Sequence, residues 1–353
     1  MLQKTVCKCA LTVIDMGDNA KIPYIFHLNS IQNIAKIINF AGQRRVFYIL
    51  YLFLNKKQEN FSPKQNIMSQ VKTYASMVKF SHTIFALPFA LTAYVYALTS
   101  TNTPFNLLLL FKILVCMVTA RNTAMGFNRW ADRDIDALNP RTASREIPAG
   151  KISPRAALIF VIINALIFAL CALWINPLCG ALSPVALLVV MGYSRTKRFT
   201  SLAHVVLGLS LGIAPVGAFL AVTGYFAFAP MILSAAVITW TAGFDILYAL
   251  QDRDFDRAHG LHSIPSRFSP IASAIISIAL HCVTLYALVA FGMAIEATMF
   301  YWIGYGIFTL WIIAQHVLYT PKKIDRIGKS FGLMNGAASI SFAVCCIVDL
   351  LTH

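Results

Sequence analysis

Nine long apolar stretches dominate the sequence after Met68 and restrict the folds that this chain can adopt. A bilayer core of about 30 Å requires about 20 apolar residues of helix. In lipid every backbone polar group must be bonded within its own segment, so each stretch should be a helix. Only 12% of the residues are charged, compared with about a quarter in soluble domains. The sequence therefore predicts an all-α polytopic membrane protein with nine transmembrane helices, over residues 78–98, 105–134, 154–174, 178–194, 200–223, 228–256, 269–292, 297–320 and 327–351.

Residues 1–67 differ from the rest, because they are polar in patches and rich in Asn, Gln and Lys. Their apolar run Val46–Leu54 has nine residues and is too short to span a bilayer. Two interpretations are open: a poorly ordered extension, or sequence upstream of a true start at Met68. We favour the second, which makes 68–353 the functional domain.

Basic residues lie in alternate links between the apolar stretches. The links near 99–104, 175–177, 224–227 and 293–296 contain no Lys or Arg, whereas the opposite links contain thirteen. The positive-inside rule assigns the basic links to the cytoplasm, and an odd number of helices then places His353 on the far side. We therefore expect a multi-pass protein of the cell inner membrane. The formal charge of +15 needs no nucleic-acid partner to explain it.

One acidic pentapeptide occurs twice, at the cytoplasmic ends of the second and sixth stretches. Asp132–Asp136 (Asp-Arg-Asp-Ile-Asp) recurs 120 positions later as Asp252–Asp256 (Asp-Arg-Asp-Phe-Asp). From residue 68 onward the chain has eleven acidic residues, and these two runs contain six of them. The repeated layout of long helix, Asp run and basic loop suggests two related halves.

Helical geometry predicts which side chains of each stretch share a face. With Arg121 at zero and 100° per residue, Asn128, Asp132 and Asp136 fall at about −20°, +20° and +60°. The sixth stretch carries a similar stripe, formed by Asp245, Tyr248, Asp252 and Asp256. Asp134 and Asp254 point away from these faces, and we assign them to local salt bridges or solvent. We expect the two stripes to face each other across a shared hollow beneath the inner membrane surface.

Carboxylates at positions i and i+4 on two helices suit a hard cation such as Mg²⁺, which completes its shell with water and phosphate oxygens. The adjoining loops are basic, with Arg141, Arg145, Lys197, Arg198 and Arg257. This combination suits a diphosphate that must be neutralised in order to leave. Acids at a helix end can also form a solvated cap, and acids in a membrane can form an ion pathway. Transporter acids more often lie near the midplane, whereas these lie at one edge.

At this point the residues resemble a known family. Asn128–Asp136 is similar to the first signature, NxxxDxxxD, of the UbiA superfamily of intramembrane aromatic prenyltransferases. The segment Phe244–Asp256 resembles the second signature, and Arg141–Gly150 and Tyr193–Arg198 resemble the two basic loops of the family. The resemblance covers about 68–353. It implies a nine-helix UbiA-type bundle with a central cavity open to the cytoplasmic side and to lipid.

The resemblance implies the transfer of a polyprenyl group from polyprenyl diphosphate to a hydroxylated aromatic acid such as 4-hydroxybenzoate, with Mg²⁺, in ubiquinone or menaquinone biosynthesis. It implies that Mg²⁺ is held by Asn128, Asp132, Asp136, Asp252 and Asp256. It implies that diphosphate is contacted, or the acceptor positioned, by Arg121, Asn128, Lys197, Arg198 and Arg145. We add His262 as a candidate diphosphate contact.

Chemistry of this type generates an allylic cation, which water must not reach and which aromatic faces can stabilise. Candidate rings are Phe85, Phe127, Trp130, Phe244 and Tyr248. The acceptor ring then loses a proton, for which Asp252 or Asp245 are the candidate bases. We name Asp252, Asp245, Arg145 and Tyr248 as the candidate catalytic residues.

The loop after the second run departs from ubiquinone-type members, which often carry a Lys two residues after its Gly. Here the stretch His259–Pro265 has His262 at that position, which fits a diphosphate contact or an ordinary loop histidine equally well. This form is closer to the 4-hydroxybenzoate polyprenyltransferase-like branch, some members of which are thought to prenylate 1,4-dihydroxy-6-naphthoate in menaquinone synthesis. The remaining alternatives are haem or chlorophyll prenylation on the same fold and, in another class, an ion-coupled transporter.

Overall fold

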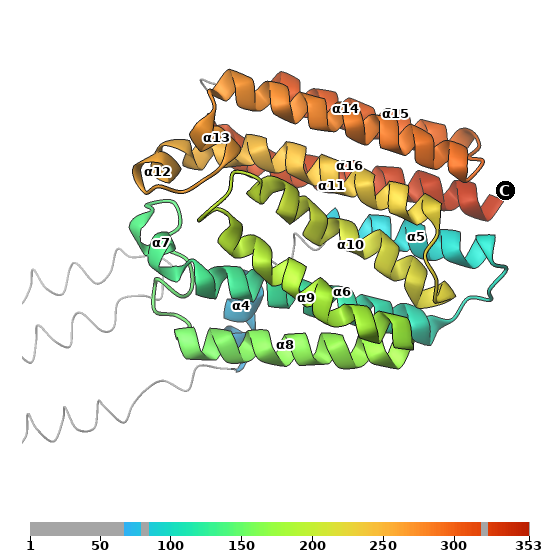
Figure 1. The fold of residues 1–353 in the computed structure, drawn as a ribbon, viewed down its shortest axis with the longest axis horizontal. Coiled ribbons are helices and arrows are strands. Elements are labelled where there is room, and N and C mark those ends of the chain that lie inside the picture. Colours follow the sequence, from blue (N-terminus) through green and yellow to red (C-terminus); the bar gives the residue numbers. More distant parts are fainter. Residues whose placement is uncertain (1–66, 79–84, 319–323, 353) are drawn as a thin grey trace, which may run out of the picture. The chain divides into compact units, whose positions relative to one another are not determined.

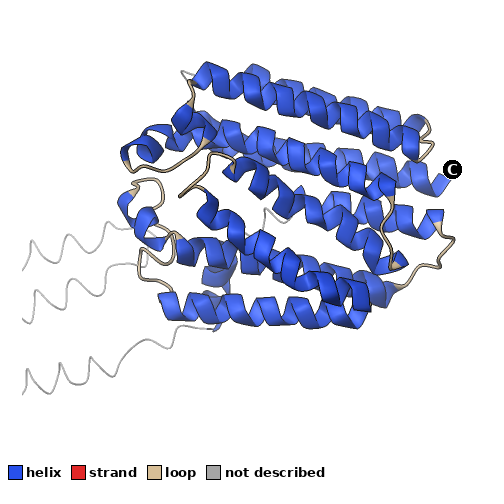
Figure 2. Ribbon diagram, viewed as in Figure 1, coloured by secondary structure: helices blue, strands red, loops and turns tan. Residues whose placement is uncertain are grey.

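The structure, a computed structural model, describes residues 67–78, 85–318 and 324–352, and the side chains of 67–68 and 324–331 are not described. These residues form helices joined by loops and contain no strand (Figure 2). The chain from Ser69 to His353 forms one compact unit. The expected extension over residues 1–67 lies almost wholly outside the described residues.

Eight helices in the described part are long and apolar enough to cross a membrane. A further helix, α5 (Leu87–Ser100), has 14 residues and is shorter than a full crossing. The prediction of nine full crossings is therefore not confirmed, because the first one begins only at Leu87 and residues 79–84 are not described. The eight helices are α6 (Leu107–Ala131), α8 (Pro154–Ile175), α9 (Pro177–Thr196), α10 (Ala203–Thr223), α11 (Phe228–Ala249), α14 (Pro270–Ala294), α15 (Met299–Leu318) and α16 (Ile324–Thr352).

Capping residues explain where several of these helices begin. Helices α8, α9 and α14 each start with proline, whose missing N–H is not needed in the first turn. The preceding Ser153, Asn176 and Ser269 each accept a hydrogen bond from a backbone N–H of that turn. Helix α10 ends at Thr223 and is followed by Gly224, whose φ of 73° is the left-handed conformation favoured by glycine.

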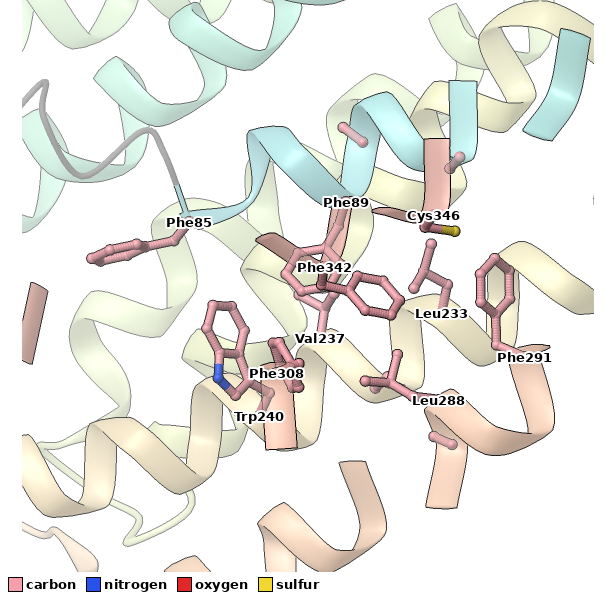
Figure 3. Packing of buried hydrophobic residues seen from close by; sticks show 14 of the residues in the cluster. Phe85, Phe89, Leu233, Val237, Trp240, Leu288, Phe291, Phe308, Phe342 and Cys346 are labelled. Carbon is pink, nitrogen blue, oxygen red and sulfur yellow. The ribbon is translucent and has the colours of Figure 1, made fainter. Parts of the chain in front are cut away.

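The core of the bundle lies between α5, α10, α11, α14, α15 and α16. Figure 3 shows aromatic rings from several of these helices packed together in it. Phe89 lies 5.4 Å from Trp240 and 5.7 Å from Phe342 between ring centroids, and Trp240 lies 5.6 Å from Phe308. By contrast, α8 exposes a face of large apolar residues, including Leu166 and Leu170. An exposed apolar face on a long helix is what lipid contact requires.

The two helices that lead into the Asp runs pack on different neighbours. Helix α6 packs on α8 and α9, whereas α11 packs on α10 and α14, and α10 contacts both α6 and α11. Three short helices follow at one end of the bundle, on the left in Figure 1: α7 (Arg133–Leu138), α12 (Arg253–Ala258) and α13 (Ile264–Arg267). The amphipathic helix α4 (Ile67–Met77) is held near this end, where its Met77 carbonyl accepts a hydrogen bond from the buried Arg129. This end therefore gathers both Asp runs and the loops that follow them.

Candidate active site

The first acid of each run lies where a long helix gives way to a short one. Helix α6 ends at Ala131, Asp132 follows with φ −98° and ψ 6°, and α7 begins at Arg133. In the second run a short 3-10 turn, Leu250–Asp252, follows α11, and Asp252 has φ −101° and ψ 1° before α12 begins. Both residues occupy the bridge region of backbone space, which is sparsely populated and frequent at active sites. The sequence predicted helices over 105–134 and 228–256. The structure changes from a long helix to a short one at Asp132 and, through a 3-10 turn, at Asp252.

The three acids of each run have different surroundings. Asp136 and Asp256, the last acids of the runs, are buried. The middle acids are exposed: the side chain of Asp134 is 82% exposed and that of Asp254 is 93% exposed, each beside the preceding arginine. This is the placement expected for Asp134 and Asp254.

In the first run, each inward acid contacts a basic residue from a loop. Asp132 accepts hydrogen bonds from Asn128 Nδ2 at 3.0 Å and from Arg198 Nη2 at 3.4 Å. Asp136 accepts two hydrogen bonds from Arg145 Nη1, at 2.6 and 2.7 Å.

In the second run, Asp252 is held by the loop of the first half. Arg141 donates to it from Nε at 2.8 Å and from Nη2 at 2.5 Å, and Asn139 Nδ2 lies 3.4 Å from the same carboxylate. Arg141 also reaches the hydroxyl of Tyr248 at 3.4 Å. These contacts join segments that are more than one hundred residues apart in the sequence, so the two halves share one site.

The last inward acid, Asp256, contacts the second basic loop. Its Oδ2 lies 3.8 Å from Lys197 Nζ and accepts a hydrogen bond from Ser263 Oγ at 2.9 Å. Four carboxylates of the two runs are therefore each matched by one basic side chain.

These acids and bases line one polar cavity of about 350 Å³. A second cavity of about 550 Å³, between α6, α9, α10 and α11, is lined almost entirely by apolar side chains. The two cavities share five lining residues, namely Arg121, Met125, Tyr193, Leu207 and Leu211. The site thus has a charged part at the end of the bundle and an apolar part deeper within it.

Three residues that line the polar cavity each carry a buried polar atom without a hydrogen-bond partner in the described part of the chain. These atoms are the Nε of Arg121 and the hydroxyl oxygens of Ser194 and Thr241. A buried polar group without a partner costs roughly 1–3 kcal/mol, and each of these atoms is itself closed off from solvent.

The electrostatics of the cavity follow from its burial and its many charges. Burial raises the pKa of the Asp132 carboxyl, the Asp136 carboxylate raises it further, and Arg198 and Lys197 offset only part of this increase. Loss of hydration lowers the pKa of Lys197, but Asp256 and the other carboxylates outweigh it, so that the net shift is upward. Burial also lowers the pKa of Arg141, and its hydrogen bonds and charge interaction with Asp252 raise it by more. Lys197 and Arg141 therefore remain charged at neutral pH.

The acids offer a ligand set that fits magnesium. Every donor is an oxygen from a carboxylate or from the Asn128 amide, as Mg²⁺ prefers. No group of three or more His, Cys, Asp or Glu side chains among the described residues lies close enough to form a complete metal cage. An incomplete cage is compatible with Mg²⁺, which usually takes one or two carboxylates and completes its shell with water and phosphate oxygens.

The structure places some of the candidate residues at the cavity and leaves others outside it. Of the aromatic candidates, Phe85, Phe244 and Tyr248 line the polar cavity, whereas Phe127 and Trp130 do not. The rings of Phe127 and Trp130 contact each other at 5.7 Å instead. The remaining candidates other than His262 all line it: Arg121, Asn128, Asp132, Asp136, Arg145, Lys197, Arg198, Asp245, Asp252 and Asp256.

The predicted diphosphate contact at His262 is not among the residues that line the polar cavity. The residue is exposed, and its backbone N–H donates a hydrogen bond to the Lys197 carbonyl at 2.7 Å. This contact ties the loop after the second Asp run to the second basic loop. The structure therefore favours the reading of His262 as a loop histidine.

Sequence reasoning missed His204, a fully buried residue near the start of α10. Its Nδ1 lies 2.7 Å from Asp245 Oδ2, 41 positions away in the sequence. No local pattern marks such a contact. The sequence identified Arg141 as a basic loop residue but did not predict its two hydrogen bonds to Asp252.

Comparisons with known proteins identify related sequences and folds. The sequence profile of the UbiA prenyltransferase family matches residues 86–339. A 4-hydroxybenzoate octaprenyltransferase of Photobacterium profundum is 30% identical over 237 residues, which are 67% of this chain and 82% of that relative. The apo structure of a UbiA homolog from Aeropyrum pernix K1 has a TM-score of 0.68 and 34% identity, and the match covers 76% of this chain and 98% of that one. A UbiA homolog from Archaeoglobus fulgidus, solved with GPP and Mg²⁺, shares the fold with a TM-score of 0.58 at 20% identity, over 78% of this chain and 99% of that one.

Proposed function

The chain belongs to the UbiA prenyltransferase family, and on that premise we propose that it transfers a polyprenyl group from polyprenyl diphosphate to a hydroxylated aromatic acid for quinone biosynthesis. The observation that carries this proposal is the junction of two unlike cavities. The polar cavity is lined by the inward acids of both Asp runs, and the apolar cavity shares Arg121 and four other lining residues with it. A prenyl diphosphate has the same two parts, a charged head and an apolar tail.

In this proposal the acids hold Mg²⁺ and the bases hold diphosphate. Asn128, Asp132, Asp136, Asp252 and Asp256 provide oxygen ligands for Mg²⁺. When bound, Mg²⁺ would neutralise the negative charge that develops on the diphosphate as it leaves. The residues that contact the diphosphate are Arg121, Arg145, Lys197 and Arg198.

Each inward acid of the two runs is paired with a basic side chain, and substrate binding would allow both members of a pair to change partners. Arg145 is bonded to Asp136, Arg198 to Asp132, Arg141 to Asp252 and Lys197 to Asp256. A metal–diphosphate complex brings both a cation and an anion. Each acid can then turn to the cation and each base to the anion, so no charge is left buried without a partner.

The apolar walls of the site would protect the allylic cation from water. Phe85, Phe244 and Tyr248 are the rings placed to face it. We favour 4-hydroxybenzoate over 1,4-dihydroxy-6-naphthoate or a haem or chlorophyll ring as the acceptor, because the similar relative is named for that acid.

The orientation in the membrane is part of the same proposal. The basic loops, and with them the polar cavity, face the cytoplasm by the positive-inside rule. In a bacterial cell this places the protein in the inner membrane.

The test is to incubate membranes containing the protein with a labelled prenyl diphosphate, Mg²⁺ and each acceptor in turn, and to measure product masses. We expect prenylated 4-hydroxybenzoate and released diphosphate, both lost when a chelator removes Mg²⁺. Prenylation of the naphthoate alone would replace the proposed acceptor. Substrate flux in sealed vesicles without diphosphate release would support the transporter and contradict the proposal.

A further inference from the structure

Five carboxylates of the two acidic stripes line the polar cavity, and one of them differs from the other four. Asp132, Asp136, Asp252 and Asp256 each lie within 4.0 Å of an Arg or Lys nitrogen. Among the described residues, Asp245 has no such partner, and its one hydrogen bond is to His204. We propose that His204 is a positioning residue that holds Asp245 as the proton acceptor of the transfer reaction. This inference rests on the prenyl transfer proposed above.

Two hydrogen bonds fix the proton on the His204 ring. The backbone N–H of Ile264 donates to His204 Nε2 at 3.3 Å, so Nε2 must present a lone pair. The proton of the neutral ring is therefore on Nδ1, from which it is donated to Asp245 Oδ2. Ile264 is the first residue of α13, where a helix leaves its N–H groups without partners inside the helix. The loop after the second Asp run thus determines the tautomer of a histidine on α10.

The second oxygen of Asp245 remains available to a substrate. Its Oδ2 is occupied by His204, whereas Oδ1 accepts no hydrogen bond from any described residue. The carboxylate reaches the polar cavity, with its side chain 21% exposed. A carboxylate that is bonded on one side and open on the other is held in place without losing its capacity to take a proton.

The position of Asp245 along α11 also suits this role. It precedes Asp252 by seven residues, which is about 10 Å along a helix. It therefore lies between the Asp runs, where the diphosphate binds, and the apolar cavity, where the prenyl tail binds. The reacting carbon of the donor connects those two parts. By contrast, both oxygens of Asp252 accept hydrogen bonds from Arg141.

In the proposed step the donor loses diphosphate and the acceptor loses a proton. The bond between the prenyl carbon and the diphosphate oxygen breaks, and its electron pair leaves with the diphosphate. A ring carbon of the acceptor forms the new carbon–carbon bond. The C–H bond at that carbon returns its electrons to the ring, and its proton passes to Asp245 Oδ1. The resulting carboxylic acid releases the proton to water when the product leaves, while His204 keeps its own proton throughout.

Two substitutions separate the two hydrogen bonds of His204. In His204→Asn the side-chain NH₂ can occupy the place of Nδ1 and still donate to Asp245, but the acceptor for Ile264 is lost. In His204→Gln the side-chain oxygen can occupy the place of Nε2 and accept from Ile264, but the donor to Asp245 is lost. A residue needed only to hold the α13 loop would tolerate Gln better than Asn.

The experiment measures kcat and KM with Mg²⁺, geranyl diphosphate and 4-hydroxybenzoate for the wild type, both His204 variants and Asp245→Asn, at equal amounts of membrane-inserted protein. General base catalysis typically contributes about 10²–10⁴-fold. We expect Asp245→Asn to lose at least about 100-fold in kcat, and His204→Gln roughly 10- to 100-fold, with each KM within about twofold of wild type. His204→Asn should stay within about threefold of wild type.

Other results would overturn the inference. Normal kcat in Asp245→Asn would remove Asp245 from the proton step, and normal kcat in His204→Gln would remove His204 as its positioning residue. Equal losses in both His204 variants, or a greater loss in Asn, would assign His204 to holding the loop. A wild-type protein that makes no prenylated product is a separate outcome, which contradicts the proposed function.

Discussion

Arg141 holds Asp252 with two hydrogen bonds, of 2.8 and 2.5 Å, and so connects the loop after the first Asp run to the second run. A guanidinium that meets a carboxylate at two points fixes both distance and orientation. The side chains are 34% and 12% exposed, so this contact is partly shielded from solvent. It therefore determines how the two halves of the site face each other.

Replacement of Arg141 tests this connection. Hydrogen bonds to charged groups are worth about 1.5–3 kcal/mol, so Arg141→Ala should lower kcat/KM by roughly 10- to 100-fold. Arg141→Lys should recover only part of the loss, because an ammonium group cannot make the paired contact. The control is Arg133→Ala, which affects an arginine beside the exposed Asp134. The measurement is kcat/KM in steady-state assays of equal amounts of inserted protein. Equal values for Arg141→Ala and Arg133→Ala would contradict the role given to Arg141.

The apolar cavity should limit the length of the prenyl chain. Gly217 lines it, and a Cβ atom added there meets no other atom within 4 Å. A Gly217→Phe side chain can therefore enter the cavity without displacing the backbone, and we expect the product distribution to shift toward shorter chains. Gly306→Phe is the matched control, since its Cβ also meets nothing within 4 Å and it lines neither cavity. The measurement supplies prenyl diphosphates of several chain lengths together and records the masses of the products. An unchanged distribution of product lengths in Gly217→Phe would mean that the prenyl tail binds elsewhere.

Asp349 should contribute to stability and not to catalysis. Its buried carboxylate, on α16, accepts hydrogen bonds from the N–H groups of Thr298 and Tyr301 at 2.8 and 3.1 Å, and from the Thr298 hydroxyl at 2.5 Å. The negative charge of Asp349 lies at the start of α15, where the helix dipole stabilises it. Asp349→Asn should therefore lower the free energy of unfolding by about 1–3 kcal/mol and lower the Tm in detergent, with kcat unchanged at low temperature. Asp134→Asn removes the same charge from an exposed site, and an equal Tm for the two variants would show that the cap is unimportant.

Composition and the length of the apolar stretches predicted the helical membrane fold, and helical periodicity predicted the two stripes of acids. Periodicity did not predict the breaks at Asp132 and Asp252. At the first break the helical spacing of hydrogen bonds is kept, because the Asp136 N–H still donates to the Asp132 carbonyl at 2.7 Å. The stripes therefore keep their order although the helix ends.

The remaining features of the site depend on contacts between distant segments. Arg141 meets Asp252 across 111 positions and His204 meets Asp245 across 41, and no local pattern encodes either distance. The same limit applies to the aromatic residues. Phe127 and Trp130 are close to the first run in sequence but lie outside the cavity, whereas Phe85 reaches it from the start of the bundle.

The central claim is that the inward acids of the two runs act together on a metal-bound diphosphate. Each run provides its own control, because the middle acid carries the same charge but is exposed. The most direct measurement is Mg²⁺-dependent prenyl transfer in membranes that contain equal amounts of inserted protein. The test variants are Asp132→Asn and Asp252→Asn, and the controls are Asp134→Asn and Asp254→Asn. We predict a loss of roughly 10²- to 10³-fold for the first pair and activity within about twofold of wild type for the second pair. Near-normal transfer by Asp132→Asn or Asp252→Asn, or equal losses in all four variants, would contradict the account.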